Sequence, residues 1–301
     1  MNYPAIITQG LTKHYGGVKA LEDLDLEITR GEIFGFLGAN GAGKTTTMRT
    51  ILDLIRPTAG TAKILGMDSR DDAVEIRRHI GYVPGDLALY PRLTGKELLT
   101  YFANLRGGVD WSYVDALAER LSSDLSRKIA NYSSGNRQKI GLIQAFMNKP
   151  DVLILDEPSS GLDPLVQQEF QALLREVSEE GRTVFLSSHT LSEVERVAHR
   201  VGIIREGRLV IVDTMEALKE KAVRRVTLHF AAPINESVFS GVPGVREVSV
   251  SGPNATISFE GPMSELLKVA TAHDVVNLTN SETDLEEIFL TLYRDPDTTY
   301  V

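Results

Sequence analysis

Residues 38–45 read Gly38-Ala39-Asn40-Gly41-Ala42-Gly43-Lys44-Thr45, which matches the phosphate-binding pattern Gly-x-x-x-x-Gly-Lys-Ser/Thr. Glycines in such a loop let successive backbone N–H groups converge on one phosphate. Lys44 is expected to reach the β- and γ-phosphates of a nucleotide, and the Thr45 hydroxyl is placed to ligate Mg²⁺. The alternative is a glycine-rich turn that only leads into a helix.

The residues on both sides of this loop predict a strand before it and a helix after it. The apolar run 32–37 reads as a buried strand, and Thr46 to Ile55 reads as a helix whose N-terminus would face the anion. Short apolar runs alternate with amphipathic segments over residues 1–217, which predicts an α/β domain. The other candidate strands of this domain are Ile6–Thr8, Leu24–Ile28, Val152–Leu155, Thr183–Ser187 and Val201–Arg205.

Two further regions differ from this α/β pattern. Residues 86–147 are rich in helical spacing and predict a helical insertion. Residues 218–301 predict a small α+β domain, which ends in a capping box at 283–286 and an apolar stripe. Its candidate elements are the strands Val223–Phe230, Val245–Val250, Ala255–Phe259 and Val275–Leu278, the helix Ser264–Ala272, and the stripe Leu285, Ile288, Phe289 and Leu292.

The composition excludes several classes of protein. The chain has 301 residues, a formal net charge of −9 and no cysteine. The negative charge argues against nucleic-acid binding through a broad basic surface, and the lack of cysteine excludes disulfides and thiolate zinc sites. No apolar stretch approaches the roughly 18 residues that a membrane span needs, and the N-terminus lacks the pattern of a signal peptide. If the protein works at a membrane, we expect another chain to cross it.

A second candidate site is the carboxylate pair Asp156-Glu157, which follows the apolar run 152–155. Such a run fits a central parallel strand, and ligands bind at the carboxyl ends of these strands. We expect Asp156 to hold Mg²⁺, directly or through water, and Glu157 to polarise the attacking water. The alternative is a strand that ends in a solvated acidic turn.

Residues 131–139 read Asn131-Tyr132-Ser133-Ser134-Gly135-Asn136-Arg137-Gln138-Lys139, and this stretch resembles the LSGGQ signature of ABC-transporter ATPases. Ser133 can cap the helix that follows, and its hydroxyl and the exposed amides near Gly135 can form an anion site. In the family this site closes over the γ-phosphate bound to the other subunit. The resemblance therefore implies that Ser133, Ser134 and Gly135 act in trans; the alternative is a serine-rich helix cap.

Three further positions match this family in the expected order. Tyr15 stands where the family stacks an aromatic ring on adenine, although it could be a core tyrosine. Residues 160–163 resemble the loop that links the two active sites of the dimer through Asp163, although they could form a plain turn. His189 follows the strand 183–187, as does the family histidine that contacts the γ-phosphate, although a histidine at a strand end is often structural.

The chain also departs from the family pattern. The signature carries Tyr132, Ser134 and Asn136 where Leu, Gly and Gln are usual. Gly85 stands where the family has a glutamine that touches Mg²⁺ and couples to the membrane partner, and Asp86 could substitute through a water molecule. The stretch 80–94 and the end of the C-terminal domain nevertheless look like the prokaryotic exporter branch that includes drug-resistance and sodium-efflux ATPases.

The resemblance implies Mg²⁺-dependent ATP hydrolysis, with Lys44, Glu157 and His189 as the catalytic residues and Thr45 and Asp156 at the metal. It further implies a homodimer, a separate transmembrane permease, no nucleic-acid partner, and a peripheral place on the cytoplasmic face of the membrane. The permease would dock near Gly85–Arg92 and the helical insertion. The implied nucleotide-binding residues are Tyr15, Gly38, Asn40, Gly41, Ala42, Gly43, Lys44, Thr45 and Thr46.

Two other functions fit the motifs less well. A soluble ABC-type ATPase acting on DNA or the ribosome would need a long coiled-coil insertion or a second cassette, and the sequence has neither. A nucleotide-sensing module with little turnover is favoured by Gly85 but opposed by the intact Glu157 and His189. The C-terminal domain is expected to hold the dimer or regulate it, or else to be a stabilising appendage. The transported substrate does not follow from the sequence.

Overall fold

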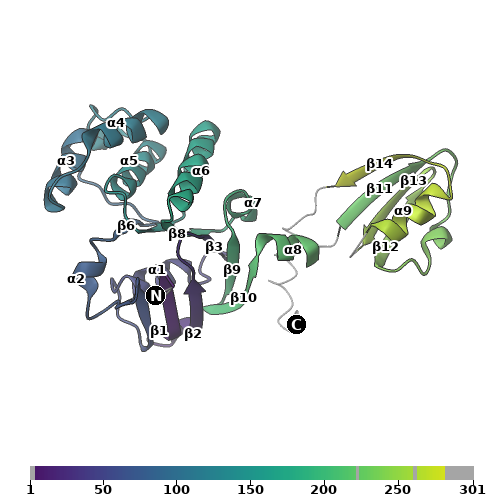
Figure 1. Ribbon diagram of the computed structural model, residues 1–301, viewed down its shortest axis with the longest axis horizontal. Coiled ribbons are helices and arrows are strands. Elements are labelled where there is room, and N and C mark those ends of the chain that lie inside the picture. Colours follow the sequence, from purple (N-terminus) through teal and green to yellow (C-terminus); the bar gives the residue numbers. More distant parts are fainter. Residues whose placement is uncertain (1–3, 222–223, 260–262, 282–301) are drawn as a thin grey trace. The chain divides into compact units, whose positions relative to one another are not determined.

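The computed structural model describes residues 4–221, 224–259 and 263–281, and it divides the chain into two compact units (Figure 1). The first unit spans Met1–Val212 and the second spans Asp213–Val301. The predicted boundary, between residues 217 and 218, falls within helix α8 (Met215–Lys221).

A largely parallel sheet forms the centre of the first unit and carries the motif residues at its strand ends. In the described part of the chain its strand order is β10-β9-β3-β8-β7-β6. Strands β3, β7 and β8 are buried along their whole lengths, as expected for a sheet that is covered on both faces. The strands are β3 (Ile33–Leu37), β6 (Ile80–Val83), β7 (Val152–Asp156), β8 (Thr183–Ser188), β9 (Arg200–Arg205) and β10 (Arg208–Thr214).

A second, antiparallel sheet packs on the helix that follows the phosphate loop. Its order is β2-β1-β4-β5, and its strands are β1 (Ile6–Tyr15), β2 (Val18–Ile28), β4 (Ala59–Ile64) and β5 (Met67–Asp68). Helix α1 (Lys44–Ile51) contributes Met48 and Ile51 to one core together with Ile6 of β1 and Phe36 of β3. Helix α1 is therefore packed between the two sheets.

The predicted helical insertion is confirmed. It contains α3 (Gly95–Leu105), α4 (Trp111–Arg120), the short η1 (Ile129–Asn131) and α5 (Ser134–Phe146), and α3, α4 and α5 lie together in Figure 1. Thr94 begins α3 with a capping box to Glu97, and Asp110 caps α4 through the N–H groups of Ser112 and Tyr113. The other helices of this unit are α2 (Ala73–Ile76), α6 (Pro164–Glu179) and α7 (Leu191–Glu195).

The second unit has an antiparallel sheet of order β12-β13-β11-β14 with helices beside it, as an α+β domain should. Its core contains Val226, Leu228, Phe230 and Phe239. The predicted capping box and apolar stripe beyond residue 282 lie outside the described residues. The elements are β11 (Arg224–Phe230), η2 (Glu236–Phe239), β12 (Val245–Ser251), β13 (Asn254–Phe259), α9 (Ser264–Thr271) and β14 (Val275–Ser281).

The sequence-based prediction of the first unit was wrong at the ends of α1 and incomplete in the sheets. The helix runs from Lys44 to Ile51 rather than from Thr46 to Ile55, because Leu52 leaves the helical conformation and Asp53 adopts a φ of 52°. Strands β4, β5, β6 and β10 were not predicted. Strand β4 shows why, since four of its six residues are exposed and it begins with Ala59-Gly60, which is a weak strand signal.

Candidate functional site

The candidate site lies where strands β3, β7 and β8 end. The parallel register pairs Leu37 with Ser188 and Asp156 with Ser187, so the three strand ends are level with one another. A cavity of about 400 Å³ opens beside these ends. It is lined by Val18, Lys19, Ala20, Ala39, Asn40, Gly41, Gly43, Lys44, Thr45, Thr46, Glu157 and Glu206.

The phosphate loop has a backbone that requires glycine at two positions. Gly41 and Gly43 have φ values of 83° and 113°, a region that other residues rarely adopt. A Cβ on Gly43 would also lie 2.8 Å from the carbonyl oxygen of Ala20. No side chain in the described part of the chain caps the N-terminus of α1. Its first amides are therefore left for an anion.

Lys44 is buried and points along the loop. It is 6% exposed, and its Nζ donates to the carbonyl oxygens of Gly38 at 2.6 Å and Ala39 at 3.3 Å. The same Nζ lies 3.1 Å from Oε1 of Glu157. The lysine therefore connects the loop to the end of β7 without any ligand.

Glu157 connects Lys44 to His189. Its Oε2 lies 2.7 Å from Nδ1 of His189, whose side chain is about half exposed. An ionised carboxylate only accepts hydrogen bonds, so this contact places the donated proton on Nδ1. Glu157 has a φ of 50°, which is uncommon for a residue other than glycine and costs on the order of 1–3 kcal/mol. Strain of this size is typical of functional sites.

Asp156 is fully buried and uses one of its carboxylate oxygens. Its Oδ1 accepts a hydrogen bond of 2.7 Å from Oγ of Ser187, whereas Oδ2 has no hydrogen-bond partner among the described residues. A Cβ on Gly85 would lie 3.0 Å from this Oδ2, so the glycine leaves more room beside the oxygen than a larger residue would. An unpaired buried carboxylate oxygen is costly, and a cation would satisfy it.

The residues fit Mg²⁺ better than a metal ion whose ligands all come from protein side chains. The described residues contain no group of three or more His, Cys, Asp and Glu side chains that could hold a metal ion. Mg²⁺ usually takes one or two carboxylates together with substrate phosphates and water. Asp156 is one carboxylate with an unpartnered oxygen, and Thr45 on the cavity wall carries a hydroxyl.

The signature lies apart from the phosphate loop of the same chain. None of the residues that line the cavity in the described part of the chain comes from 131–139. Ser133 caps α5 as expected, because its Oγ accepts the N–H of Asn136 at 3.2 Å. A Cβ on Gly135 would lie 2.2 Å from the carbonyl oxygen of Gly161, so the signature helix packs on the loop 160–163. The unusual Tyr132 is buried, and its hydroxyl donates to the carbonyl oxygen of Asp124.

The other predicted site residues are Asp163, Tyr15 and Asp86, and each has its own surroundings. Asp163 caps α6 by accepting the N–H of Val166, and this hydrogen bond, with Lys139 nearby, lowers the pKa of Asp163 below its usual value. Tyr15 is about half exposed with Nζ of Lys13 4.9 Å from its ring centre, and it does not line the cavity. Asp86 is exposed.

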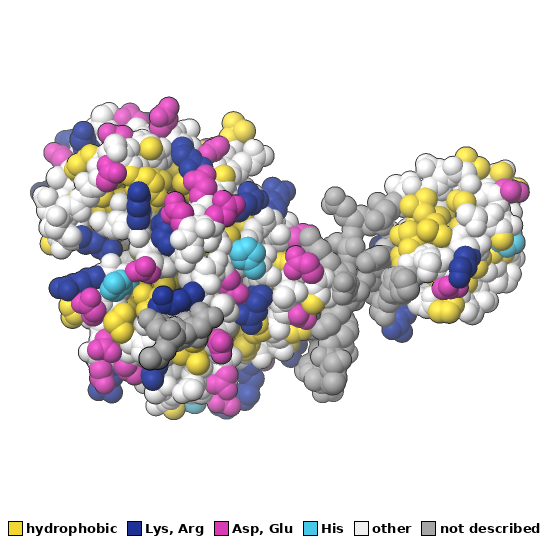
Figure 2. Space-filling model, in the orientation of Figure 1, with side chains coloured by type: hydrophobic (Ala, Val, Ile, Leu, Met, Phe, Trp, Pro, Cys, Tyr) yellow, Lys and Arg dark blue, Asp and Glu magenta, His cyan; other side chains and the backbone are white. Residues whose placement is uncertain are grey.

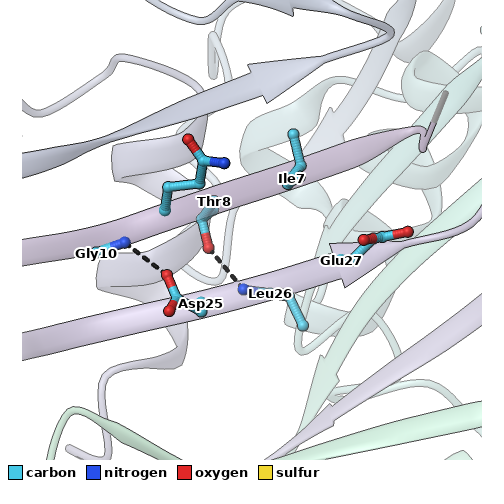
Figure 3. A pocket seen from close by; sticks show the side chains of 7 residues that line it. Ile7, Thr8, Gly10, Asp25, Leu26 and Glu27 are labelled. Carbon is cyan, nitrogen blue, oxygen red and sulfur yellow. Dashed lines mark hydrogen bonds between the residues drawn. The ribbon is translucent and has the colours of Figure 1, made fainter.

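The hydroxyl of Ser187 is a site group that was not predicted from the sequence, and it bonds to both Asp156 and the backbone of Glu157. The sequence signal that could have identified Ser187 is its position two residues before His189. A second cavity, on β1 and β2, contains no motif residue (Figure 3). There the N–H of Gly10 donates to Asp25 and the N–H of Leu26 donates to Thr8, which holds an irregular stretch of the two strands together.

Comparison with known proteins gives consistent matches. The family model described as "ABC transporter" matches residues 21–160. The chain is 35% identical to "Bacitracin transport ATP-binding protein BcrA" of Bacillus licheniformis, over 95% of this chain and 96% of that protein. It is 32% identical to "Daunorubicin/doxorubicin resistance ATP-binding protein DrrA" of Streptomyces peucetius, over 97% and 93% of the two chains.

Solved structures match about seven tenths of the chain. The "Structure of ATP binding subunit of ABC transporter" gives a TM-score of 0.66 at 31% identity and covers 71% of this chain and 92% of that one. The "Dimeric Structure of MJ0796, a Bacterial ABC Transporter Cassette" gives 0.65 at 25% identity and covers 70% and 98%. No helix in the described ranges is both long and apolar enough to cross a membrane.

Proposed function

This chain belongs to the ABC transporter family as an ATP-binding subunit that hydrolyses ATP, and on this premise we propose that it energises an exporter through the cavity at residues 38–46. The contact chain Lys44–Glu157–His189 is the observation that carries the proposal. It joins a phosphate-binding lysine, a carboxylate and an imidazole within 3.1 Å at each contact, and the lysine and the carboxylate line the cavity.

Each of these side chains has a separate task in the proposed reaction. Lys44 offsets negative charge on the β- and γ-phosphates, and the free amides of α1 orient them. Glu157 orients and polarises the attacking water once ATP takes over its place on Lys44. His189 donates a hydrogen bond toward the γ-phosphate or Glu157. Phosphoryl transfer needs positioning and charge neutralisation rather than a covalent intermediate, and this site offers both.

The proposal includes a magnesium ion at Asp156 and Thr45. Bound Mg²⁺ would neutralise charge on the β- and γ-phosphates. The support from this chain is the carboxylate of Asp156, which is 0% exposed and whose Oδ2 has no hydrogen-bond partner among the described residues. Asp86 is exposed and could reach the ion only through water.

We propose that two chains form the working unit. Within one chain the signature does not line the cavity, so the site as described lacks its second anion-binding element. Ser133, Ser134 and Gly135 of a second copy would complete it. This arrangement is supported by a relative whose solved structure is described as dimeric.

We further propose a separate membrane permease as partner, with this chain at the cytoplasmic face of the membrane. A groove of about 800 Å³ supports a docking site beside the helical insertion. The exposed side chains of Val74 and Leu105 offer it apolar contacts, and Tyr90 is an exposed aromatic residue within the predicted segment 85–92. The groove is lined by Val74, Arg77, Arg78, Leu105, Arg106 and Asn148.

The relatives and the distribution of surface charge both favour a role in export over a role in nucleic-acid binding. The named relatives serve bacitracin transport and drug resistance. On the face of the first unit shown in Figure 2, acidic and basic side chains are interspersed and no broad basic surface is present among the described residues.

The domain arrangement is also a proposal: residues 1–217 bind nucleotide, and residues 218–301 are an accessory domain that stabilises or regulates the dimer. Removal of the chain beyond Lys221 tests the second part. We expect weaker self-association and altered ATPase activity, whereas unchanged values of both would contradict it.

The Glu157→Gln variant tests the proposed function. The amide keeps the size of the side chain but cannot polarise water as a carboxylate does, so we expect turnover to fall on the order of 100-fold while ATP binding persists. Light scattering should then show an ATP-dependent dimer of the variant. With the permease added, wild-type protein should move substrate in membrane vesicles and the variant should not. Full turnover by Glu157→Gln would contradict the proposal.

A further inference from the structure

Ser187 lies at the end of β8 and connects the two carboxylate residues of β7. It is 0% exposed. Its Oγ lies 2.7 Å from Oδ1 of Asp156 and 3.0 Å from the backbone nitrogen of Glu157. The parallel register places Ser187 directly beside Asp156, so the bridge spans two neighbouring strand ends.

The chemistry of the groups fixes the direction of both hydrogen bonds. A serine hydroxyl has one proton to donate and lone pairs with which to accept. The backbone N–H of Glu157 can only donate, and the ionised carboxylate of Asp156 can only accept. The hydroxyl of Ser187 therefore donates to Asp156 and accepts from Glu157, and both bonds are satisfied together.

These two hydrogen bonds act on two unusual features of the site, the unpartnered Oδ2 of Asp156 and the positive φ of Glu157. The bond to Oδ1 holds the carboxylate of Asp156 so that Oδ2 remains without a partner among the described residues, next to Gly85. The bond to the Glu157 amide supports a residue with a φ of 50°. One hydroxyl thus restrains both the proposed metal ligand and the residue that polarises water.

We propose that Ser187 is a positioning residue for ATP hydrolysis, which keeps Oδ2 of Asp156 available to the cation that accompanies ATP and keeps Glu157 in its turned conformation. This rests on the proposed role of Asp156 at Mg²⁺. Partners that orient a metal ligand commonly contribute about 10- to 100-fold to metal affinity or activity when they are removed.

The next residue of the same strand offers a matched control. Ser188 is also buried, at 1% exposure, but its hydroxyl contacts Glu193 at 2.7 Å and the N–H of Thr190 at 2.9 Å. In the described structure its hydroxyl has no hydrogen bond to Asp156 or Glu157. A change at Ser188 therefore removes a buried hydroxyl from β8 without touching the bridge.

The experiment measures the affinity of the full chain for the fluorescent nucleotide mant-ATP, once with Mg²⁺ and once with EDTA. The ratio of the two affinities is the contribution of the metal. For Ser187→Ala we expect this ratio to fall about tenfold, with the affinity in EDTA unchanged and kcat lowered by a similar factor. Ser188→Ala should keep the ratio, and Asp156→Asn should lose it.

The outcomes separate this proposal from the proposed function. If Asp156→Asn loses the ratio and Ser187→Ala keeps it, Ser187 has no positioning role and only this proposal is overturned. If Asp156→Asn keeps the full ratio, the metal assignment fails and the proposal fails with it. If Ser187→Ala does not fold, Ser187→Cys takes its place, because a thiol of similar size is a weak donor. It should also lower the ratio, and an unchanged ratio would overturn the proposal.

Discussion

The phosphate loop and the signature helix each contain a buried lysine paired with a carboxylate, but the two pairs are built differently. Lys44 is 6% exposed and pairs with Glu157 at 3.1 Å; Lys139 is 7% exposed and pairs with Asp163 at 3.4 Å. The first pair lines a cavity and joins a glycine loop to a strained residue. The second pair joins two regular helices, because Asp163 caps α6.

This difference shows in which of the two pairs a ligand can replace the partners of the lysine. The carbonyl partners of Lys44 and its carboxylate lie on loops at strand ends, so a phosphate can replace them without breaking a helix. Oδ1 of Asp163 accepts the N–H of Val166 while Oδ2 meets Lys139, so the second pair is fixed to a helix N-terminus and not to a loop. Two lysines of similar burial, each paired with a carboxylate, therefore need not have the same function.

The largest effect should come from replacing Lys44, and the separate replacement of Lys139 is the comparison. Lys44→Met should lower ATP turnover on the order of 100-fold or more, because it removes the fixed positive charge from the phosphate site. Lys139→Met should keep ATP affinity in the wild-type range, since Lys139 does not line the cavity. ATPase assays and mant-ATP titrations measure both. Equal losses of affinity in the two variants would remove the distinction drawn between the pairs.

A smaller effect should follow from crowding the signature. Gly135→Ala places a Cβ 2.2 Å from the backbone oxygen of Gly161, so the free energy of unfolding should fall by about 1–3 kcal/mol. Denaturant unfolding followed by circular dichroism measures it. Gly17→Ala is the control, because a Cβ there would meet nothing within 4 Å. Wild-type stability of Gly135→Ala would mean that the signature and the loop 160–163 do not pack this closely.

The N-terminal caps of α5 and α1 should differ by about 1 kcal/mol in their contribution to the free energy of unfolding. Ser133→Ala removes the hydroxyl that accepts the N–H of Asn136 and should destabilise the protein by about 1 kcal/mol. At Gly43 the described structure has no side-chain cap to lose. Thermal unfolding without nucleotide is the measurement, with Ser134→Ala as the exposed neighbour. An effect of Ser134→Ala as large as that of Ser133→Ala would argue against the cap.

The smallest effect concerns pH at Asp163. The N–H of Val166 and the charge of Lys139 lower the folded-state pKa of Asp163, so its contribution is fully present above the unfolded pKa and is lost as the pH falls through the folded pKa. Asp163→Asn keeps a capping oxygen without the charge. The variant should lose less stability on acidification than the wild type, as denaturant unfolding at a series of pH values would show. Parallel curves would assign the acid sensitivity to other carboxylates.

Local signals predicted much of the fold and part of the site. The buried strands β3, β7 and β8 were predictable from continuous apolar runs, and the cap at Ser133 was predictable from its neighbours in the chain. The bridge through Ser187 was not, because it depends on the register between β7 and β8.

The contacts of Gly85 and Gly135 were missed for a related reason. Each depends on how closely two distant backbone segments approach, with Asp156 near Gly85 and Gly161 near Gly135. A sequence shows a glycine but not what stands opposite it. The roles assigned to the individual site residues stay predictions until the variants are made.

The left-handed backbone at Glu157 also restricts which substitutions a gene can accept. At a φ of 50°, asparagine, aspartate and glycine fit with little strain, whereas valine, isoleucine and threonine fit poorly. A copy of this chain that lost hydrolysis by drift would keep its fold most easily with one of the first three residues. Natural inactive variants should therefore show a narrow set of replacements at this position, chosen by backbone geometry rather than by chemistry.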